Sequence, residues 1–179
     1  MPKKIIIFTD SGDTIIDEGT EIRNDDGIVI HAELIPGAGE TLKAFYDAGY
    51  VIAMVADGEE QSFTNVYEEN GLGYCFHTRT ISEIVGIQKP SKRMFFDAME
   101  KNQLTEEDKK RVVMIGNNVK KDVAGANRFG ITSILLDWSP RYDMNPSDGS
   151  ETPDYTVHEP KELIALIERL EAELEDKIK

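Results

Sequence analysis

Short apolar runs that alternate with amphipathic stretches dominate this chain of 179 residues. The expected strands are residues 4–8, 50–56, 78–81, 111–115, 131–136 and, as a short edge strand, 155–157. Stretches with helical periodicity separate them, and a final helix is expected over residues 160–178. Because strands joined by helices usually pair in parallel, this order predicts a doubly wound, mostly parallel, Rossmann-like α/β sheet with helices on both faces.

The sequence shows no sign of a division into parts. It has no internal repeat, no low-complexity segment and no linker that would separate two units. A single domain over residues 1–179 is therefore predicted. Residues 20–31 have the pattern of a small hairpin, with two short apolar runs around a turn at residues 24–27. We interpret this hairpin as a short flap.

Charge and composition exclude several classes of partner. The chain has 34 acidic and 20 basic residues, a net charge of −14. Nucleic acid is a poor partner for such a surface, because duplex binding depends on Lys and Arg contacts to phosphate. No apolar run approaches the roughly 20 residues needed to cross a bilayer, so no membrane partner is expected. Cys75 is the only cysteine, which excludes an internal disulfide, and a cytoplasmic location is predicted.

Polar residues follow the expected strands at the points where these strands end. Asp10 opens the segment 10–14 after the first strand, and Asp57 follows the second. Asn117 follows the fourth strand, and Lys89 stands before an expected helix. In parallel sheets ligands bind at the carboxyl ends of the strands, so these side chains are expected to surround one site.

The order of these residues resembles the haloacid dehalogenase-like hydrolase superfamily. Its first motif, Asp-x-Asp-x-Thr after an apolar strand, is matched by Asp10 and Thr14. Its lysine motif is matched by Lys89, which precedes a proline. Its fourth motif, Gly-Asp-x-x-x-x-Asp, is matched by Gly116 and Asp122. The resemblance covers roughly residues 3–136 and supports the expected fold.

The resemblance implies a metal-dependent phosphatase. Asp10 would attack phosphorus and form an aspartyl-phosphate that water then hydrolyses. Lys89 would neutralise phosphate oxygens, and Thr14 would orient the nucleophile loop. The segment Ala56, Asp57 and Gly58 corresponds to the phosphate-binding second motif.

The resemblance also implies a cofactor, Mg²⁺, which takes oxygen ligands and keeps several waters. Its expected ligands are the Asp10 carboxylate, the Gly12 carbonyl and the Asn117 side chain. Asp122 would hold the ion or its waters. The partner would be a phosphorylated substrate.

Three positions depart from the family pattern. Gly12 stands where an aspartate usually acts as general acid and base, Ala56 where a hydroxyl binds phosphate, and Asn117 where an aspartate binds metal. Loss of the acid predicts a turnover slower by roughly 10²–10⁴ where the leaving group needs a proton. Asp13 is the candidate replacement, and aspartate restored at position 12 would be expected to raise turnover.

Two other functions stay open. One is a catalytically impaired binding protein that keeps the fold. The other, ranked third, is carbon–halogen or carbon–phosphorus hydrolysis, whose enzymes generally carry a cap domain. The short intervals between the motifs predict that this chain has no cap domain.

Two segments near the end of the chain allow alternatives. Arg141 lies in the loop after the fifth strand and either clamps a substrate anion or belongs to a packed aromatic loop. In the last helix an apolar stripe contains Leu163, Ile167, Leu170, Leu174 and Ile178. The stripe packs either on the chain's own sheet or against a second copy in a homodimer.

Overall fold

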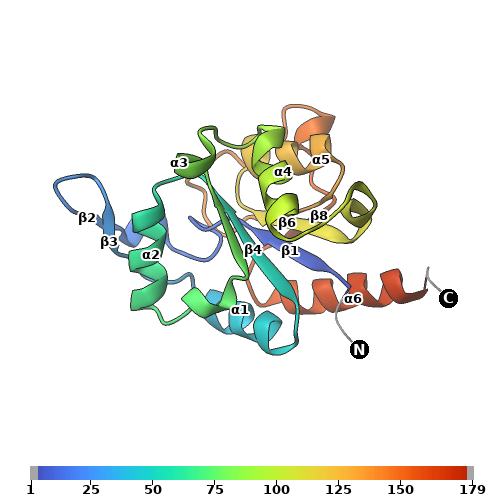
Figure 1. The fold of residues 1–179 in the computed structure, drawn as a ribbon, viewed down its shortest axis with the longest axis horizontal. Coiled ribbons are helices and arrows are strands. Elements are labelled where there is room, and N and C mark those ends of the chain that lie inside the picture. Colours follow the sequence, from blue (N-terminus) through green and yellow to red (C-terminus); the bar gives the residue numbers. More distant parts are fainter. Residues whose placement is uncertain (1–3, 177–179) are drawn as a thin grey trace.

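A parallel sheet forms the centre of the molecule in the computed structural model, which describes residues 4–176 (Figure 1). Its strands run in the order β5-β4-β1-β6-β7-β8, and every neighbouring pair is parallel. The strands are β1 (Ile6–Thr9), β4 (Val51–Ala56), β5 (Thr78–Ile81), β6 (Val112–Gly116), β7 (Thr132–Leu136) and β8 (Tyr155–Val157). The strand order reverses beside β1, which is where ligands bind in sheets of this kind.

Helices cover both faces of this sheet, as the sequence predicted (Figure 1). The first face carries α1 (Ala38–Asp47), α2 (Glu60–Glu69) and α6 (Glu162–Asp176). The opposite face carries α4 (Lys92–Lys101) and α5 (Ala124–Phe129). In the described part of the chain, four short 3-10 helices occur in connections, at Glu18–Thr20 (η1), Gly73–Cys75 (η2), Glu106–Arg111 (η3) and Gly149–Glu151 (η5).

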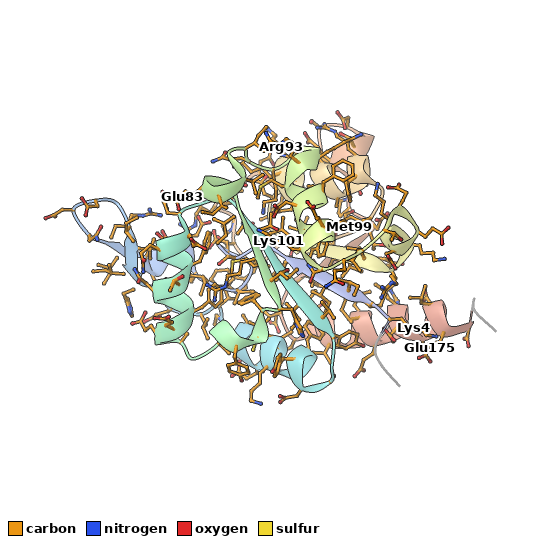
Figure 2. All side chains as sticks on the ribbon, in the orientation of Figure 1. Lys4, Glu83, Arg93, Met99, Lys101 and Glu175 are labelled. Atoms are coloured by element: carbon orange, nitrogen blue, oxygen red, sulfur yellow. The ribbon has the colours of Figure 1, made fainter. Side chains whose placement is uncertain are left out.

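The apolar side chains of β1 point alternately to the two faces and so contribute to two cores. Ile7 belongs to the layer beneath α1 and α6, whereas Ile6 and Phe8 belong to the layer beneath α4 and α5. Successive side chains of a strand point to opposite faces, so a strand covered on both sides must be apolar throughout. Figure 2 shows side chains filling the space on both sides of the sheet; Met99 belongs to the second layer.

The flap predicted over residues 20–31 is present as a two-stranded antiparallel hairpin, β2 (Ile22–Arg23) and β3 (Val29–His31). It projects beside α2 (left in Figure 1). The α2 helix holds it in place, because the Ser62 hydroxyl accepts a hydrogen bond from the Val29 N–H at 3.0 Å and Asn65 donates to the Val29 carbonyl at 2.9 Å. The hairpin forms a sheet of its own, and no cap domain is evident within residues 4–176.

Some local details differ from the expectation. The helix expected between the fourth and fifth strands begins as a π-helical turn, Val119–Val123 (η4), and becomes α-helical only at Ala124. A short helix that was not predicted, α3 (Ser82–Val85), follows β5. Its single turn is too short to show a helical period in the sequence.

The stripe of α6 packs on the chain's own core. Leu163 and Ile167 are buried there, and Leu170 and Leu174 pack against the same cluster. Position 178 lies outside the described residues. The described part of the stripe therefore belongs to the first core layer, and a homodimer through this helix stays a prediction.

No helix among the described residues has the length and apolar character to span a membrane.

Candidate active site

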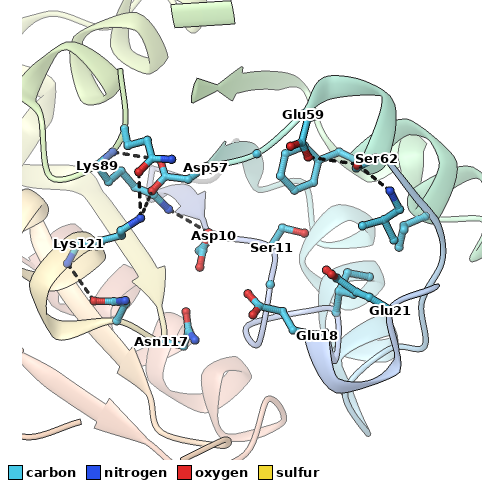
Figure 3. A pocket seen from close by; sticks show the side chains of 18 of the residues that line it. Asp10, Ser11, Glu18, Glu21, Asp57, Glu59, Ser62, Lys89, Asn117 and Lys121 are labelled. Atoms are coloured by element: carbon cyan, nitrogen blue, oxygen red, sulfur yellow. Dashed lines mark hydrogen bonds and ion pairs between the residues drawn. The ribbon is translucent and has the colours of Figure 1, made fainter. Parts of the chain in front are cut away.

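The residues after three adjacent strands meet at the carboxyl edge of the sheet. Asp10 follows β1, Asp57 follows β4 and Asn117 follows β6, and β1 lies between the other two strands. The Asp10 N–H donates to the Ile115 carbonyl at 2.9 Å, which fixes its backbone to β6. All three residues line a pocket of about 300 Å³ (Figure 3). The described residues around it include Ser11, Gly12, Glu18, Glu21, Arg23, Gly58, Glu59, Phe63, Lys89, Lys121, Asp122 and Tyr142.

Lys89 lies at the centre of the charged network in this pocket, although only 3% of the residue is exposed. Its Nζ atom donates to Asp10 Oδ1 at 2.9 Å and to Asp122 Oδ1 at 2.7 Å. A third hydrogen bond, of 2.7 Å, goes to the Val55 carbonyl. Burial lowers the lysine pKa, but the two carboxylates outweigh it and the net shift is upward. Lys89 is therefore a fixed positive charge beside Asp10.

The Asp122 carboxylate is fully engaged. Its Oδ1 accepts from Lys89, and its Oδ2 accepts from the backbone N–H groups of Asn117 and Asn118, each at 3.1 Å. Burial, reinforced by the Asp10 carboxylate, raises the pKa of Asp122. The structure thus places Asp122 where it holds Lys89 and the β6–η4 loop, with hydrogen bonds on both carboxylate oxygens.

Three groups that carry oxygen lie close together: the Asp10 carboxylate, the Gly12 carbonyl and the Asn117 side-chain amide. One branch of the Asn117 side-chain amide lies 3.0 Å from Asp10 Oδ2 and 3.3 Å from the Gly12 carbonyl oxygen. With nitrogen in that branch, Asn117 donates to both oxygens. With oxygen there, three oxygens face one another without a donor, and a cation would complete the arrangement. The donor set fits a hard cation, but it contributes a single carboxylate.

No group of three or more His, Cys, Asp or Glu side chains among residues 4–176 has the geometry of a metal cluster. A cation at Asp10 would therefore depend on one charged ligand and two neutral ones. Affinity for Mg²⁺ rises with the charge of its oxygen ligands, so this site is expected to be weak.

Asp57 organises the positive side of the pocket. Its Oδ1 accepts from the Lys89 N–H at 3.0 Å, and its Oδ2 accepts from Lys121 Nζ at 3.0 Å. The neighbouring Gly58 N–H donates to the Ser82 hydroxyl at 2.9 Å. Ala56 is buried and does not line the pocket. Of the three residues expected to bind phosphate through the second motif, Asp57 and Gly58 are therefore at the pocket wall.

The sequence missed Glu18, which lines the pocket close to Gly12. Tyr142 donates a 2.8 Å hydrogen bond to Glu18 Oε2. Burial raises the pKa of Glu18, the Tyr142 hydrogen bond opposes this, and the Asp13 and Asp10 carboxylates add to the rise. Glu18 belongs to no motif of the resemblance, so nothing in its sequence context distinguished it from a surface glutamate.

Asp13 does not lie where a replacement acid was expected. It is fully buried and does not line the pocket. Its Oδ2 accepts from Arg141 Nε at 2.7 Å and its Oδ1 from the Glu18 N–H at 3.1 Å. Its φ is positive, 50°, a conformation that aspartate tolerates better than most residues. Arg141 pairs with Asp13 and also lies near Asp17 and Glu18, so its guanidinium group is not free to bind a substrate anion.

Thr14 is buried, and its hydroxyl has no hydrogen-bond partner among the described residues. Other contacts hold the loop that carries Asp10. The Ser11 hydroxyl lies 2.8 Å from the Tyr67 hydroxyl of α2. The backbone N–H groups of Ile15 and Ile16 both donate to the Ser11 carbonyl, at 2.8 and 3.1 Å.

Comparison with known protein families matches most of this chain to one of them. The family model of the haloacid dehalogenase-like hydrolases matches residues 4–130. The glyceraldehyde 3-phosphate phosphatase of Methanopyrus kandleri is 27% identical over 135 residues, which are 75% of this chain and 57% of that protein. This chain thus spans little more than half the length of that curated relative.

The fold is also similar to those of solved structures. The HAD phosphatase of Thermococcus onnurineus superposes with a TM-score of 0.71 at 18% identity, covering 91% of this chain and 97% of that one. The HAD-hydrolase YfnB of Bacillus subtilis, solved bound to magnesium, superposes with a TM-score of 0.66 at 22% identity. In that case the match covers 75% of this chain and 56% of that one.

Proposed function

The chain belongs to the haloacid dehalogenase-like hydrolase family, and from this membership we propose that it hydrolyses phosphate monoesters through an aspartyl-phosphate on Asp10. The observation that carries the proposal is the pair of Asp10 and Lys89, 2.9 Å apart at the base of an open pocket. A carboxylate nucleophile and a fixed cation are the two groups that attack on phosphorus requires.

The two oxygens of Asp10 have different tasks. Oδ1 is hydrogen-bonded to Lys89, which holds the side chain in one orientation. Oδ2 lies on the Asn117 side, where the proposed cation would be held. The Asp10 carboxylate would form the bond to phosphorus while the bond to the leaving oxygen breaks. Lys89 and Lys121 provide positive charge for the phosphate oxygens, in a molecule whose overall charge of −14 would otherwise repel them.

Mg²⁺ is the cofactor that we propose. Asp10, the Gly12 carbonyl and Asn117 would hold it, since Asp10 Oδ2 and the Gly12 carbonyl oxygen lie 3.0 and 3.3 Å from the Asn117 amide. When bound it would neutralise charge on the phosphate oxygens. Asp122 accepts hydrogen bonds from Lys89 and from backbone N–H groups, and through them it would hold Lys89 and Asn117 in place.

The substrate is proposed to be a phosphorylated molecule that reaches an open site. The absence of an evident cap over residues 4–176 leaves the flap and the loop with Tyr142 as the boundaries of the leaving-group side. The Methanopyrus relative is named for a small phosphorylated substrate, which supports the choice of phosphate esters.

The test is hydrolysis of p-nitrophenyl phosphate with Mg²⁺ by the wild type and by Asp10→Asn. We expect Mg²⁺-dependent turnover in the wild type and a loss of roughly 10³-fold or more in the variant, which keeps the size of the side chain but cannot form the acyl phosphate. Acid-quenched wild-type enzyme should carry a phosphoryl group on Asp10 by mass spectrometry.

The alternatives are outcomes of the same test. Equal activity in both proteins would exclude Asp10 as nucleophile. If neither protein has activity but the wild type binds phosphate through Lys89, an impaired binding protein is the better description. Release of halide or cleavage of a phosphonate, without ester hydrolysis, would support the third function.

A further inference from the structure

A carboxyl group fills the space that a side chain at position 12 would occupy. A Cβ atom added to Gly12 would lie 2.1 Å from Oε1 of Glu18 and 2.9 Å from its Cγ. Both distances are far below van der Waals contact, so Glu18 in this position and a side chain at position 12 exclude each other. Because position 12 has no side chain, the Glu18 carboxyl group can occupy the space beside it.

Contacts from two directions hold Glu18 in this place. Its backbone N–H donates to Asp13 Oδ1 at 3.1 Å, at the start of η1. Its Oε2 accepts from the Tyr142 hydroxyl at 2.8 Å, and Arg141 Nε is 4.0 Å from the same oxygen. Oε1, the oxygen nearer to Gly12, has no hydrogen bond to any other residue in the described part of the chain. Figure 3 shows the carboxyl group on the pocket wall that faces Asp10 and Asn117.

The other acidic side chains around the pocket are occupied or stand elsewhere. Asp57 and Asp122 have both oxygens hydrogen-bonded. Asp13 is outside the pocket. Glu21 pairs with Arg23 on the flap at 2.7 Å, and Glu59 lies at the start of α2, on the upper rim in Figure 3. Glu18 alone among these carries an unoccupied oxygen beside the nucleophile loop.

We propose that Glu18, positioned by Tyr142 and Asp13, is the general acid and base of this enzyme. The assignment rests on the proposed function. As Asp10 attacks phosphorus, the bond to the leaving oxygen breaks, and the proton of the Glu18 carboxyl group passes to that oxygen and gives an alcohol. In the second step the Glu18 carboxylate takes a proton from water while the water oxygen attacks phosphorus. The bond to Asp10 then breaks, phosphate leaves, and Glu18 is protonated again.

Glu18 changes the expected effect of a side chain at position 12. The sequence alone suggested that Gly12→Asp would raise turnover. In the structure the added side chain collides with Glu18, so the single variant should lose activity. The atoms that the added side chain would meet belong to the flexible end of Glu18, so Gly12→Asp combined with Glu18→Ala moves a carboxyl group to position 12 without that collision.

The experiment compares two esters, with Mg²⁺ present. The p-nitrophenolate anion is a good leaving group and needs no proton as it departs, whereas the alkoxide that leaves from glycerol 2-phosphate must be protonated. Glu18→Gln should lower kcat/KM for glycerol 2-phosphate by roughly 10²-fold or more and change that for p-nitrophenyl phosphate by less than about tenfold. Glu18→Ala should behave alike, and adding Gly12→Asp to it should recover at least about tenfold on the alkyl ester. Tyr142→Phe should show a weaker form of the same selective loss, because it removes the hydrogen bond that orients Glu18.

Glu33→Gln is the matched control, an exposed glutamate outside the pocket. It should leave both esters unchanged. If Glu18→Gln lowers both esters equally, or neither, while turnover still depends on Asp10, the assignment of Glu18 is wrong and the proposed function stands. If neither ester is turned over in an Asp10-dependent way, both are wrong.

Discussion

Lys89 shows how one buried charge determines the conformation of the residues around it. All three protons of its ammonium group are used, on Asp10, Asp122 and the Val55 carbonyl. A buried ion network contributes little net stability when complete, but removing one partner leaves uncompensated charge. A change at Lys89 is therefore expected to affect both the stability of the fold and the arrangement of the pocket residues.

Lys89→Met should lower the free energy of unfolding by about 3–5 kcal/mol, because Asp10 and Asp122 lose their counter-charge in a buried place. Lys121→Met is the matched control. Lys121 also pairs with a pocket aspartate, but its side chain is 39% exposed, and the expected cost is about 1 kcal/mol or less. Urea unfolding of both variants at neutral pH measures the difference. Equal stability of the two would contradict the central role of Lys89.

Asn117 sets the strength of the proposed cation site. Asn117→Asp adds a second carboxylate within about 3 Å of Asp10, so the metal-free protein should melt at a lower temperature. The same charge should tighten Mg²⁺ binding by roughly tenfold. Thermal melting across a Mg²⁺ titration reports both effects, since ligand binding to the native state raises the midpoint. A titration curve identical to that of the wild type would place the ion elsewhere.

At the scale of an element, the η3 helix is held by a capping box before β6. Asp108 Oδ2 accepts from the Thr105 N–H at 2.6 Å and from the Thr105 hydroxyl at 2.9 Å. Asp108 Oδ1 accepts from Arg111 Nε at 2.8 Å, and Arg111 in turn donates to the Lys4 carbonyl. This chain of contacts ties the entrance of β6 to the segment that leads into β1.

Asp108→Ala should cost about 1 kcal/mol at neutral pH, the usual value of a lost cap. The Thr105 N–H, followed by Arg111, lowers the pKa of Asp108 from 3.8 to about 2. A lowered pKa stabilises the native state above pH 4, and this contribution is lost as the pH falls from about 4 to about 2. The difference in melting temperature between variant and wild type should therefore shrink over that interval. Glu107→Ala, an exposed neighbour, should show no such trend.

At the scale of the whole molecule, the charge of −14 opposes the approach of a phosphate ester. The pocket itself mixes Lys89, Lys121 and Arg23 with several carboxylates, so attraction is confined to short range. Salt screens the long-range repulsion, with a Debye length of about 10 Å at 0.1 M, but hardly affects the buried pairs.

Raising NaCl from low concentration to about 0.15 M, at constant Mg²⁺, should therefore increase kcat/KM for a phosphate dianion by at least about twofold. The value of kcat, measured at saturation, should stay the same, because encounter no longer limits it. Steady-state kinetics at several salt concentrations test this. A fall in kcat/KM with salt would mean that the local lysines, and not the net charge, govern the approach of substrate.

Local sequence was enough to predict the framework of the site. A strand buried on both faces must be apolar along its length, and the first polar residue after it marks its carboxyl end. Since parallel strands end at the same edge, Asp10, Asp57 and Asn117 could be placed together before any contact was known. The flap and the order of helices followed from equally local patterns, the turn at 24–27 and the helical period.

The roles of individual acidic side chains depended on contacts between distant segments. Asp13 was a plausible acid by position, but Arg141, 128 positions further along the chain, holds it away from the pocket. Tyr142, 124 positions from Glu18, orients the carboxyl group that lies beside Gly12. A loop side chain has several staggered rotamers of similar energy, and its neighbours in space select one of them. The sequence therefore determined where the site is. Only the packing of the loop at 138–153 against the segment after β1 decided which acidic side chain faces the pocket.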